Sequence, residues 1–356
     1  MNPPVKSSET GDWVTDSAPD RDVVVSSRVR FARNLMEHTF PEKASPDEQE
    51  SVRETIRQVV SQEEDEDDWR LIDVEELTDV ERQLLCERRL ASEDLMSNPY
   101  GGLFFRTDEN LGLMVNEEDH LRIQALEAGG RINSAFQRAT EFERQMDDEL
   151  DFAFDDDWGY LSACPTNLGT GLRASVLLHL PGLVLVQKIN KVLKAVSNLG
   201  LTVRGFEGEG SESKGFYFQL SNQVTMGQSA DELKQTIQRV TGQIVEQERA
   251  AREGILNKAS LDIEDRIWRS YGALNHARKI SSDESLQRIS FYRLGVDVGE
   301  LPECPLSLLD GLLLLTQPAH LVHSLGEDLS SDQRDFYRAR RIRERLNSVE
   351  DDEGTT

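Results

Sequence analysis

The chain has 356 residues, with 66 acidic against 40 basic side chains and a formal net charge of −26. This length is enough for a large core and for two domains. So acidic a chain has no general attraction for nucleic acid or for an anionic membrane surface, and we expect neither as a partner. Three scattered cysteines and the lack of a long apolar run predict a cytoplasmic protein without disulfides.

The first twenty residues are polar and rich in Pro, Ser and Asp, which predicts a flexible N-terminal arm over 1–20. An alternating strand is then expected over Val23–Arg33. Side chains alternate between the two faces of a strand, so Arg28 and Arg30 share a face and repel each other. Either an anion lies opposite this pair, or the face is solvated and balanced by local acids.

A helix start is predicted at Ser45-Pro46-Asp47-Glu48, where a capping residue is followed by proline and then glutamate. Further along, the apolar run Leu111–Val115 leads into Asn116-Glu117-Glu118-Asp119-His120-Leu121-Arg122. Charges that end a buried strand carry a desolvation cost unless they are used. Acids are also favoured at helix N-termini, so a helix from about Asp119 to Arg144 is expected, with Glu118 at the strand–helix junction.

The stretch Cys164–Arg173 combines a thiol, two glycines and a terminal arginine, and the apolar run after it predicts a buried strand. Glycines allow a ligand to approach the backbone, and arginine offers a planar donor fork. A second hairpin is expected between Leu201–Arg204 and Phe216–Asn222, with Glu209 in its glycine-rich loop.

These segments together supply two glutamates, one cysteine and a set of arginines that suits a triphosphate. An arginine guanidinium is a poor nucleophile because it stays protonated up to a pKa above ~12. Carboxylates that orient it and accept its proton supply general-base catalysis, while positioning and charge neutralisation supply the rest. The residue types therefore favour phosphoryl transfer from ATP to a guanidino nitrogen. The arginines are Arg28, Arg30, Arg122, Arg173 and Arg204.

The C-terminal third is predicted to be helical, with capping boxes at Ser229–Glu232, Ser281–Glu284 and Ser330–Gln333. Its last helix places Arg334 and Arg338 one turn apart with Asp335 between them. Two forks and one carboxylate match the two ends of a phosphoarginine side chain, although a solvated helix face is the plainer reading. His320 and His323 lack nearby acid or thiol ligands, and no metal site is predicted.

Three segments resemble the signature segments of the ATP:guanido phosphotransferase (phosphagen kinase) family. The resemblance implies an α+β fold in which an antiparallel sheet is flanked by helices. It also implies that the five arginines hold ATP, bound as its Mg²⁺ complex, and that Glu118, Glu209 and Cys164 are catalytic. The segments are Asn116–Arg122, Cys164–Arg173 and Ser221-Asn222.

Small-molecule kinases of this family carry a helical domain of about a hundred residues before the sheet, and this chain has only about twenty residues there. The chain therefore resembles the shorter bacterial protein arginine kinases, and Arg334–Ala339 is similar to their R-D-x-x-R-A phosphoarginine-binding motif. We expect a catalytic domain over 21–256, a C-terminal helical domain over 257–347 with an allosteric phosphoarginine site, and a tail over 348–356.

The resemblance further implies protein substrates with exposed arginines, a role in protein quality control, an activator protein, Clp-type protease machinery and a homodimer. Two other functions stay open at this point. One is a small-molecule guanidino kinase, and the other is a phosphoarginine-binding module whose kinase site is inactive. Sequence alone does not identify the target proteins.

Overall fold

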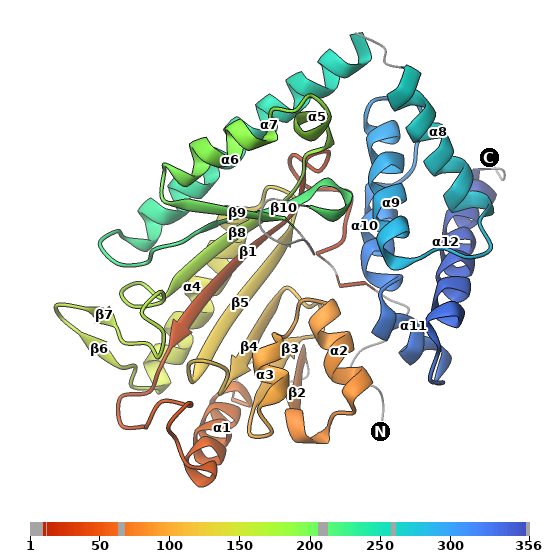
Figure 1. Ribbon diagram of the computed structural model, residues 1–356. Coiled ribbons are helices and arrows are strands. Elements are labelled where there is room, and N and C mark those ends of the chain that lie inside the picture. The colour runs from red at the N-terminus through yellow and green to blue at the C-terminus, as the bar shows by residue number, and fades with distance from the viewer. Residues whose placement is uncertain (1–9, 12, 63–67, 206–212, 258–260, 354–356) are drawn as a thin grey trace.

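The computed structural model describes residues 10–11, 13–62, 68–205, 213–257 and 261–353. Its centre is an eight-stranded antiparallel sheet in the order β2-β3-β4-β5-β1-β8-β10-β9 (Figure 1). A separate two-stranded hairpin joins β6 to β7. The strands are β1 (Val24–Arg33), β2 (Trp69–Asp73), β3 (Gly102–Arg106), β4 (Leu111–Val115), β5 (Leu121–Ala128), β6 (Phe154–Asp155), β7 (Gly159–Tyr160), β8 (Leu172–His179), β9 (Leu201–Gly205) and β10 (Tyr217–Asn222).

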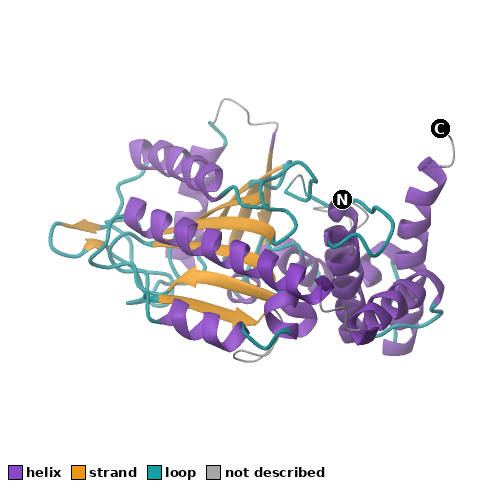
Figure 2. Ribbon diagram, turned by 90° about the horizontal axis from the view of Figure 1, so that it is seen from above, coloured by secondary structure: helices purple, strands orange, loops and turns teal. Residues whose placement is uncertain are grey.

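Helices flank the sheet, and the last five, labelled in Figure 1, gather at one end of it; Figure 2 shows the same arrangement from above. None of the helices in the described ranges is long and apolar enough to cross a bilayer. The helices are α1 (Pro46–Val60), α2 (Asp79–Glu87), α3 (Glu93–Ser97), α4 (Ile132–Glu149), α5 (Pro181–Leu185), α6 (Ile189–Ser197), α7 (Ala230–Asn257), α8 (Leu261–His276), α9 (Ser282–Asp297), α10 (Leu306–Leu315), α11 (Pro318–Leu325) and α12 (Ser331–Glu353).

The main hydrophobic core lies between one face of the sheet and helices α4 and α7. Val29 and Phe31 of β1 point into this core, as the alternation of the strand predicts, and they meet apolar side chains such as Phe142 of α4. Arg28 and Arg30 consequently point to the opposite face.

Two groups of helices cover parts of that opposite face. Helices α2 and α3 pack over β3 and β4, where Leu84 and Leu95 meet Phe105 and Met114. At the other end, Leu177 of β8 packs into the core of the C-terminal helices. The arginine face is therefore bordered by helices on two sides.

Several predicted elements are confirmed. Ser45 and Glu48 form the capping box of α1, and Ser229 and Glu232 form the same pair at α7. The helix predicted from Asp119 to Arg144 is wrong, because a strand, β5, occupies its first half and α4 begins only at Ile132. Pairing with β1 and β4 on both sides overrides the helix-favouring composition of this segment.

The N-terminal arm also differs from expectation in its described part. Trp13 is buried with Leu126 and Leu314, and Asp16 accepts hydrogen bonds from the backbone and hydroxyl of Ser307 at 2.7 and 2.6 Å. The prediction of a flexible arm is therefore wrong for residues 13–20, because the buried side chain of Trp13 and the hydrogen bonds of Asp16 connect this segment to the sheet and to α10. Residues 1–9 and 12 lie outside the described part of the chain.

Candidate functional site

The sheet register places all five predicted arginines on one face. Arg30 lies directly opposite Arg173 across β1 and β8, and Arg122 lies opposite Ala32 across β5 and β1. Arg204 of β9 lies opposite Gln219, whose own partner on β8 is Leu177, so it shares the same face. Arg122, Arg173 and Arg204 are near strand ends as predicted, whereas Arg28 and Arg30 lie within β1.

Of these five guanidinium groups, only Arg122 forms an ion pair with a carboxylate in the described part of the chain. The Nε atoms of Arg30 and Arg173 are buried there without a hydrogen-bond partner. Burial and the nearby guanidinium groups, Arg89 first among them, lower the pKa of Arg28 to about 9. Burial and Arg204 likewise lower the pKa of Arg173. A bound polyanion would relieve both the repulsion and the missing hydrogen bonds.

Arg89, which the sequence reasoning missed, lines a small cavity on this face together with Arg28, Ser175 and Gln219. It follows α2 and has a left-handed backbone with φ of 63°, and its carbonyl accepts a hydrogen bond from Gln124 at 2.8 Å. This conformation belongs to the cap that ends α2, in which the backbone N–H of Leu90 donates to the carbonyl of Leu85 at 3.1 Å and that of Arg89 to Cys86 at 2.9 Å. The positive φ is visible only in the folded chain.

Glu117 is a structural residue of the site and does not face a substrate. Glu117 forms an ion pair with Arg122 and accepts a hydrogen bond from Ser92 at 2.5 Å. Its carboxylate is almost fully buried, whereas its neighbour Glu118 is exposed. Glu117 therefore orients Arg122, and Glu118 is the glutamate that a substrate can reach.

Residues 116–120 form the tight turn between β4 and β5, and this turn is tied to the loop that carries Cys164. Asp119 accepts hydrogen bonds from Asn34 at 2.6 Å and from the backbone N–H of Ala163 at 2.7 Å. Asn167 donates to Asp119 at 3.3 Å and to Glu118 at 3.1 Å. Asp119 and Asn167 thus hold Glu118 beside the loop.

Cys164 lies partly exposed in this loop, with its Sγ 3.1 Å from the hydroxyl of Thr166. Gly171, with φ of 62°, is needed at the loop's end because a Cβ there would lie 2.6 Å from the carbonyl oxygen of Ala32. The loop brings Cys164 close to the turn that bears Glu118, as the sequence predicts for two residues of one site. Glu209 lies outside the described residues.

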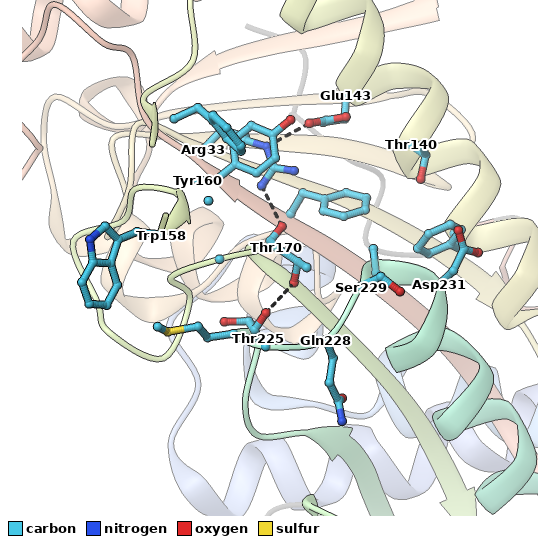
Figure 3. A pocket seen from close by; sticks show the side chains of 18 of the residues that line it. Arg33, Thr140, Glu143, Trp158, Tyr160, Thr170, Thr225, Gln228, Ser229 and Asp231 are labelled. Atoms are coloured by element: carbon cyan, nitrogen blue, oxygen red, sulfur yellow. Dashed lines mark hydrogen bonds and ion pairs between the residues drawn. The ribbon is translucent and has the colours of Figure 1, made fainter. Parts of the chain in front are cut away.

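The opposite side of the same loop borders a larger hollow of about 690 Å³, which we call the hairpin cavity (Figure 3). Phe31, Phe136 and Tyr160 line it, together with Gly169 and Thr170 of the Cys164 loop. Because Phe31 points away from the arginine face, this cavity is distinct from the arginine site.

No cluster of three or more His, Cys, Asp or Glu side chains suited to a metal ion occurs in the described ranges. His320 instead lies 2.8 Å from Glu87, which also accepts the backbone N–H groups of Ala319 and His320 at the start of α11.

His120 is a structural residue within the turn. Its Nδ1 accepts the backbone N–H of Leu35 at 3.1 Å, so Nε2 carries the proton and donates to the carbonyl of Thr39 at 3.0 Å. Burial lowers the pKa of this imidazole to about 4. The folded protein therefore holds His120 neutral at a pH at which the unfolded chain would protonate it.

Acidification is expected to destabilise the fold through this residue. The unfolded chain binds a proton near pH 6.5 and the folded chain only near pH 4, so the free energy of unfolding falls as the pH drops between these values. The loss amounts to about 3 kcal/mol at most. Urea unfolding from pH 4 to 7 should show a smaller pH slope for His120→Asn than for the wild type. Equal slopes would contradict this assignment.

The C-terminal helix α12 carries Arg334, Asp335 and Arg338, but the two arginines differ. Arg338 is only 2% exposed and donates to the carbonyls of Thr316 at 2.9 Å and Ile280 at 3.0 Å, and to Asp335 at 2.6 Å. Arg334 is half-buried and donates to Leu329 at 2.8 Å. The sequence suggests two open guanidinium forks, whereas Arg338 connects α12 to neighbouring segments.

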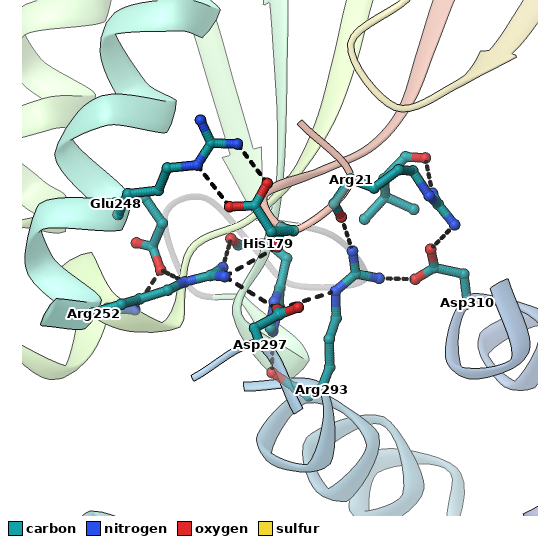
Figure 4. A network of polar contacts seen from close by, with 12 residues as sticks. Arg21, His179, Glu248, Arg252, Arg293, Asp297 and Asp310 are labelled. Atoms are coloured by element: carbon teal, nitrogen blue, oxygen red, sulfur yellow. Dashed lines mark hydrogen bonds and ion pairs between the residues drawn. The ribbon is translucent and has the colours of Figure 1, made fainter. Parts of the chain in front are cut away.

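A buried polar network joins the C-terminal helices to the sheet (Figure 4). Arg293 of α9 pairs with Asp310 and donates to the carbonyl of Arg21. Arg252 of α7 donates to Asp297 at 3.1 Å and to the carbonyl of His179 at 3.1 Å. Burial raises the pKa of Asp297 to about 6. The network connects the start of β1 and the end of β8, which lie side by side in the sheet, to α9 and α10.

Most of the chain matches known protein families. Residues 51–251 match the profile of the ATP:guanido phosphotransferase C-terminal catalytic domain, and residues 260–356 match that of the protein-arginine kinase McsB C-terminal domain. The chain is 44% identical to the protein-arginine kinase of Brevibacillus brevis over 344 residues, 96% of each chain. It is also 44% identical to that of Halothermothrix orenii over 336 residues, 94% of this chain and 96% of the relative.

Solved structures show the same fold at lower identity. Lombricine kinase superposes with a TM-score of 0.59 at 22% identity and covers 70% of this chain and 71% of its own. The duplicated taurocyamine kinase from Schistosoma mansoni gives a TM-score of 0.60 at 23% identity, over 73% of this chain and 40% of its own. The antiparallel sheet flanked by helices is thus the guanidino-kinase fold.

Proposed function

The chain belongs to the ATP:guanido phosphotransferase family, and from this premise we propose that it is a protein-arginine kinase. It transfers the γ-phosphoryl group of ATP to arginine side chains of proteins. The observation that carries the proposal is the group of five arginines on one sheet face, next to the turn that presents Glu118 and the loop that presents Cys164.

The arginine face supplies the electrostatic part of catalysis. Arg28, Arg30, Arg122, Arg173 and Arg204 bind the phosphates of the nucleotide, which enters as its Mg²⁺ complex. Charge spreads over the phosphoryl oxygens during transfer, and fixed guanidinium donors stabilise that charge without reorganising. The ion pair with Glu117 keeps Arg122 oriented toward the other arginines.

The two glutamates and the cysteine bind and activate the guanidinium group of the substrate. Glu118 is exposed and held by Asn167, so its free oxygen is available to orient the guanidinium and to accept its proton. We assign the same task to Glu209 from the family resemblance. Cys164 lies beside the turn of Glu118 and stabilises the guanidinium electrostatically without carrying the phosphoryl group.

We further propose a catalytic domain over 21–256 and a C-terminal helical domain over 257–347, in which Arg334, Asp335 and Arg338 bind phosphoarginine. The buried bonds of Arg338 support a modified arrangement. Arg338 holds Asp335 toward the ligand's donors, and the less buried Arg334 binds the phosphoryl oxygens.

This arrangement predicts unequal roles on α12. Arg334→Ala should weaken the binding of free phosphoarginine about tenfold, measured by calorimetry, because it removes the accessible guanidinium. Arg340→Ala is the matched control, since Arg340 lies on the same helix, is exposed and pairs with Glu344 at 2.6 Å. Equal phosphoarginine affinity in the wild type and Arg334→Ala would reduce α12 to a structural helix.

The proposed substrate class is tested by competition between protein and free arginine. Wild-type protein with labelled ATP should label an unfolded protein and leave free arginine essentially unlabelled. Preferential labelling of free arginine would instead identify a small-molecule guanidino kinase. Binding of phosphoarginine without any transfer would identify a binding module with an inactive kinase site.

The family resemblance extends the proposal to partners. An activator protein, Clp-type protease machinery and a second copy of the chain are the partners it implies, with a role in protein quality control in the cytoplasm. The three cysteines, none of which is paired in a disulfide, fit a reducing compartment.

A further inference from the structure

The hairpin cavity has an apolar floor and an apolar rim. Its floor is formed by Phe31, Phe136 and Tyr160. At its rim, Phe154, Trp158 and Met226 are 48%, 53% and 41% exposed, which is costly for large apolar side chains that cover nothing. Figure 3 shows Trp158 and Thr225 on two different segments at the edge of the cavity. Such a surface is suited to an apolar side chain from another molecule.

Arg33 and Lys234, two cations near the cavity, are already engaged by neighbouring groups, whereas Arg144 lines it with an exposed side chain. The guanidinium of Arg33 stacks 3.4 Å from the ring centre of Tyr160. It also donates to Glu143 at 2.9 Å and to the carbonyl of Thr170 at 3.0 Å. Lys234 lies 4.5 Å from the ring centre of Phe136. Lys234 also pairs with Asp231 at 2.6 Å, so the groups left to bind a ligand are the aromatic rings, Asp157 and Arg144.

The rim is tied rigidly to the Cys164 loop. The backbone N–H of Tyr160 donates to Gly169 at 2.9 Å, which pairs β7 with the loop. On the other side, the hydroxyl of Thr225 lies 3.0 Å from the carbonyl of Thr166 and 2.6 Å from that of Leu168. A ligand in the cavity is therefore held at a fixed position relative to the loop that carries Cys164.

Acidic residues surround the cavity. Asp157 and Asp231 line it, and Asp155 and Asp156 belong to the same β6–β7 hairpin. Glu143 and these four aspartates outnumber Arg33, Arg144 and Lys234, so the surplus charge around the cavity is negative. A positively charged polypeptide segment would be attracted to this rim.

We propose that the hairpin cavity is a docking site for the polypeptide substrate. The occupant is an extended, positively charged segment of an unfolded protein. One aromatic or aliphatic side chain enters the cavity while a neighbouring arginine reaches Glu118 around the Cys164 loop. This inference rests on the proposed function, which places the guanidinium beside Glu118 and Cys164. An unfolded substrate is expected because folded proteins bury most large apolar side chains.

Two labelled basic peptides of equal length test the docking site. Each contains a single arginine, and they differ only in a phenylalanine or a serine at one position flanking it. Fluorescence anisotropy should show that the wild type binds the phenylalanine peptide at least about tenfold more tightly. The double variant Trp158→Ala, Met226→Ala should lose this preference. Trp268→Ala is the matched control, since Trp268 is 46% exposed on α8 and should keep it.

The outcomes separate this inference from the kinase assignment. Equal affinity of the wild type for the two peptides would overturn the docking site, and so would an unchanged preference in the double variant. If the wild type shows the preference in binding but phosphorylates neither peptide, the docking site stands and the kinase assignment fails. If instead both peptides bind with equal affinity and are phosphorylated with equal kcat/KM, the kinase assignment stands and the docking site fails.

Discussion

Replacing Glu118 with glutamine is expected to lower kcat at least about a hundredfold while ATP affinity stays nearly unchanged. Glutamine keeps an oxygen that can accept the hydrogen bond from Asn167, so the turn should keep its geometry. It cannot accept the proton of the attacking guanidinium, and it no longer carries the charge that orients this group. Single-turnover phosphorylation of a protein substrate measures the effect, and calorimetry with ATP confirms that the nucleotide site remains.

Glu303→Gln is the matched control, since Glu303 is exposed and lies outside the site. It should behave as the wild type. The same loss of rate is expected for Glu209→Gln on the basis of the family resemblance. Near-normal rates for both Glu118→Gln and Glu209→Gln would exclude general-base catalysis by these carboxylates.

Replacing Arg30 with methionine should abolish nucleotide binding and at the same time stabilise the ligand-free protein. Arg30 lies opposite Arg173 and its Nε is buried without a partner in the described part of the chain. Methionine removes a repelled charge and an unsatisfied donor, and it packs well in irregular spaces. The melting temperature without ligand should therefore rise in the variant.

Saturating ATP supplies the second half of this test. It should raise the melting temperature of the wild type, since a ligand at a hundred times its Kd contributes about 2.7 kcal/mol. It should have no effect on Arg30→Met. Arg269→Met, which removes an exposed arginine paired with Asp265 on α8, should keep the ATP response. A variant that is less stable without ligand and still responds to ATP would show that Arg30 is structural.

Much of the sheet follows from local sequence patterns. The alternation of Val29 and Phe31 with Arg28 and Arg30 predicts which face of β1 is charged, because a strand's period of two leaves no other arrangement. The capping boxes at Ser45 and Ser229 likewise mark helix starts correctly, since capping depends on residues close in sequence. The resemblance to the family's signature segments adds that the sheet is antiparallel and flanked by helices.

Other features depend on contacts that no local pattern shows. The acids around Glu118 form a hairpin turn, and the apparent helix after them is β5, because β1 and β4 supply hydrogen-bond partners on both sides. Asp119 connects Asn34, Ala163 and Asn167, residues that come together only in the folded chain. Arg338 looks like a surface arginine in the sequence but is buried by α10 and the segment around Ile280.

The chemical nature of the phosphorylated product tests the central claim most directly. After incubation of the wild type with ATP and an unfolded protein, mass spectrometry should locate phosphate on arginine, and that phosphate should be labile in acid and stable in base. The same preparation of Glu118→Gln should contain very little of it. Acid-stable phosphate on serine or threonine, or phosphate trapped on Cys164, would contradict direct transfer from ATP to a guanidino nitrogen.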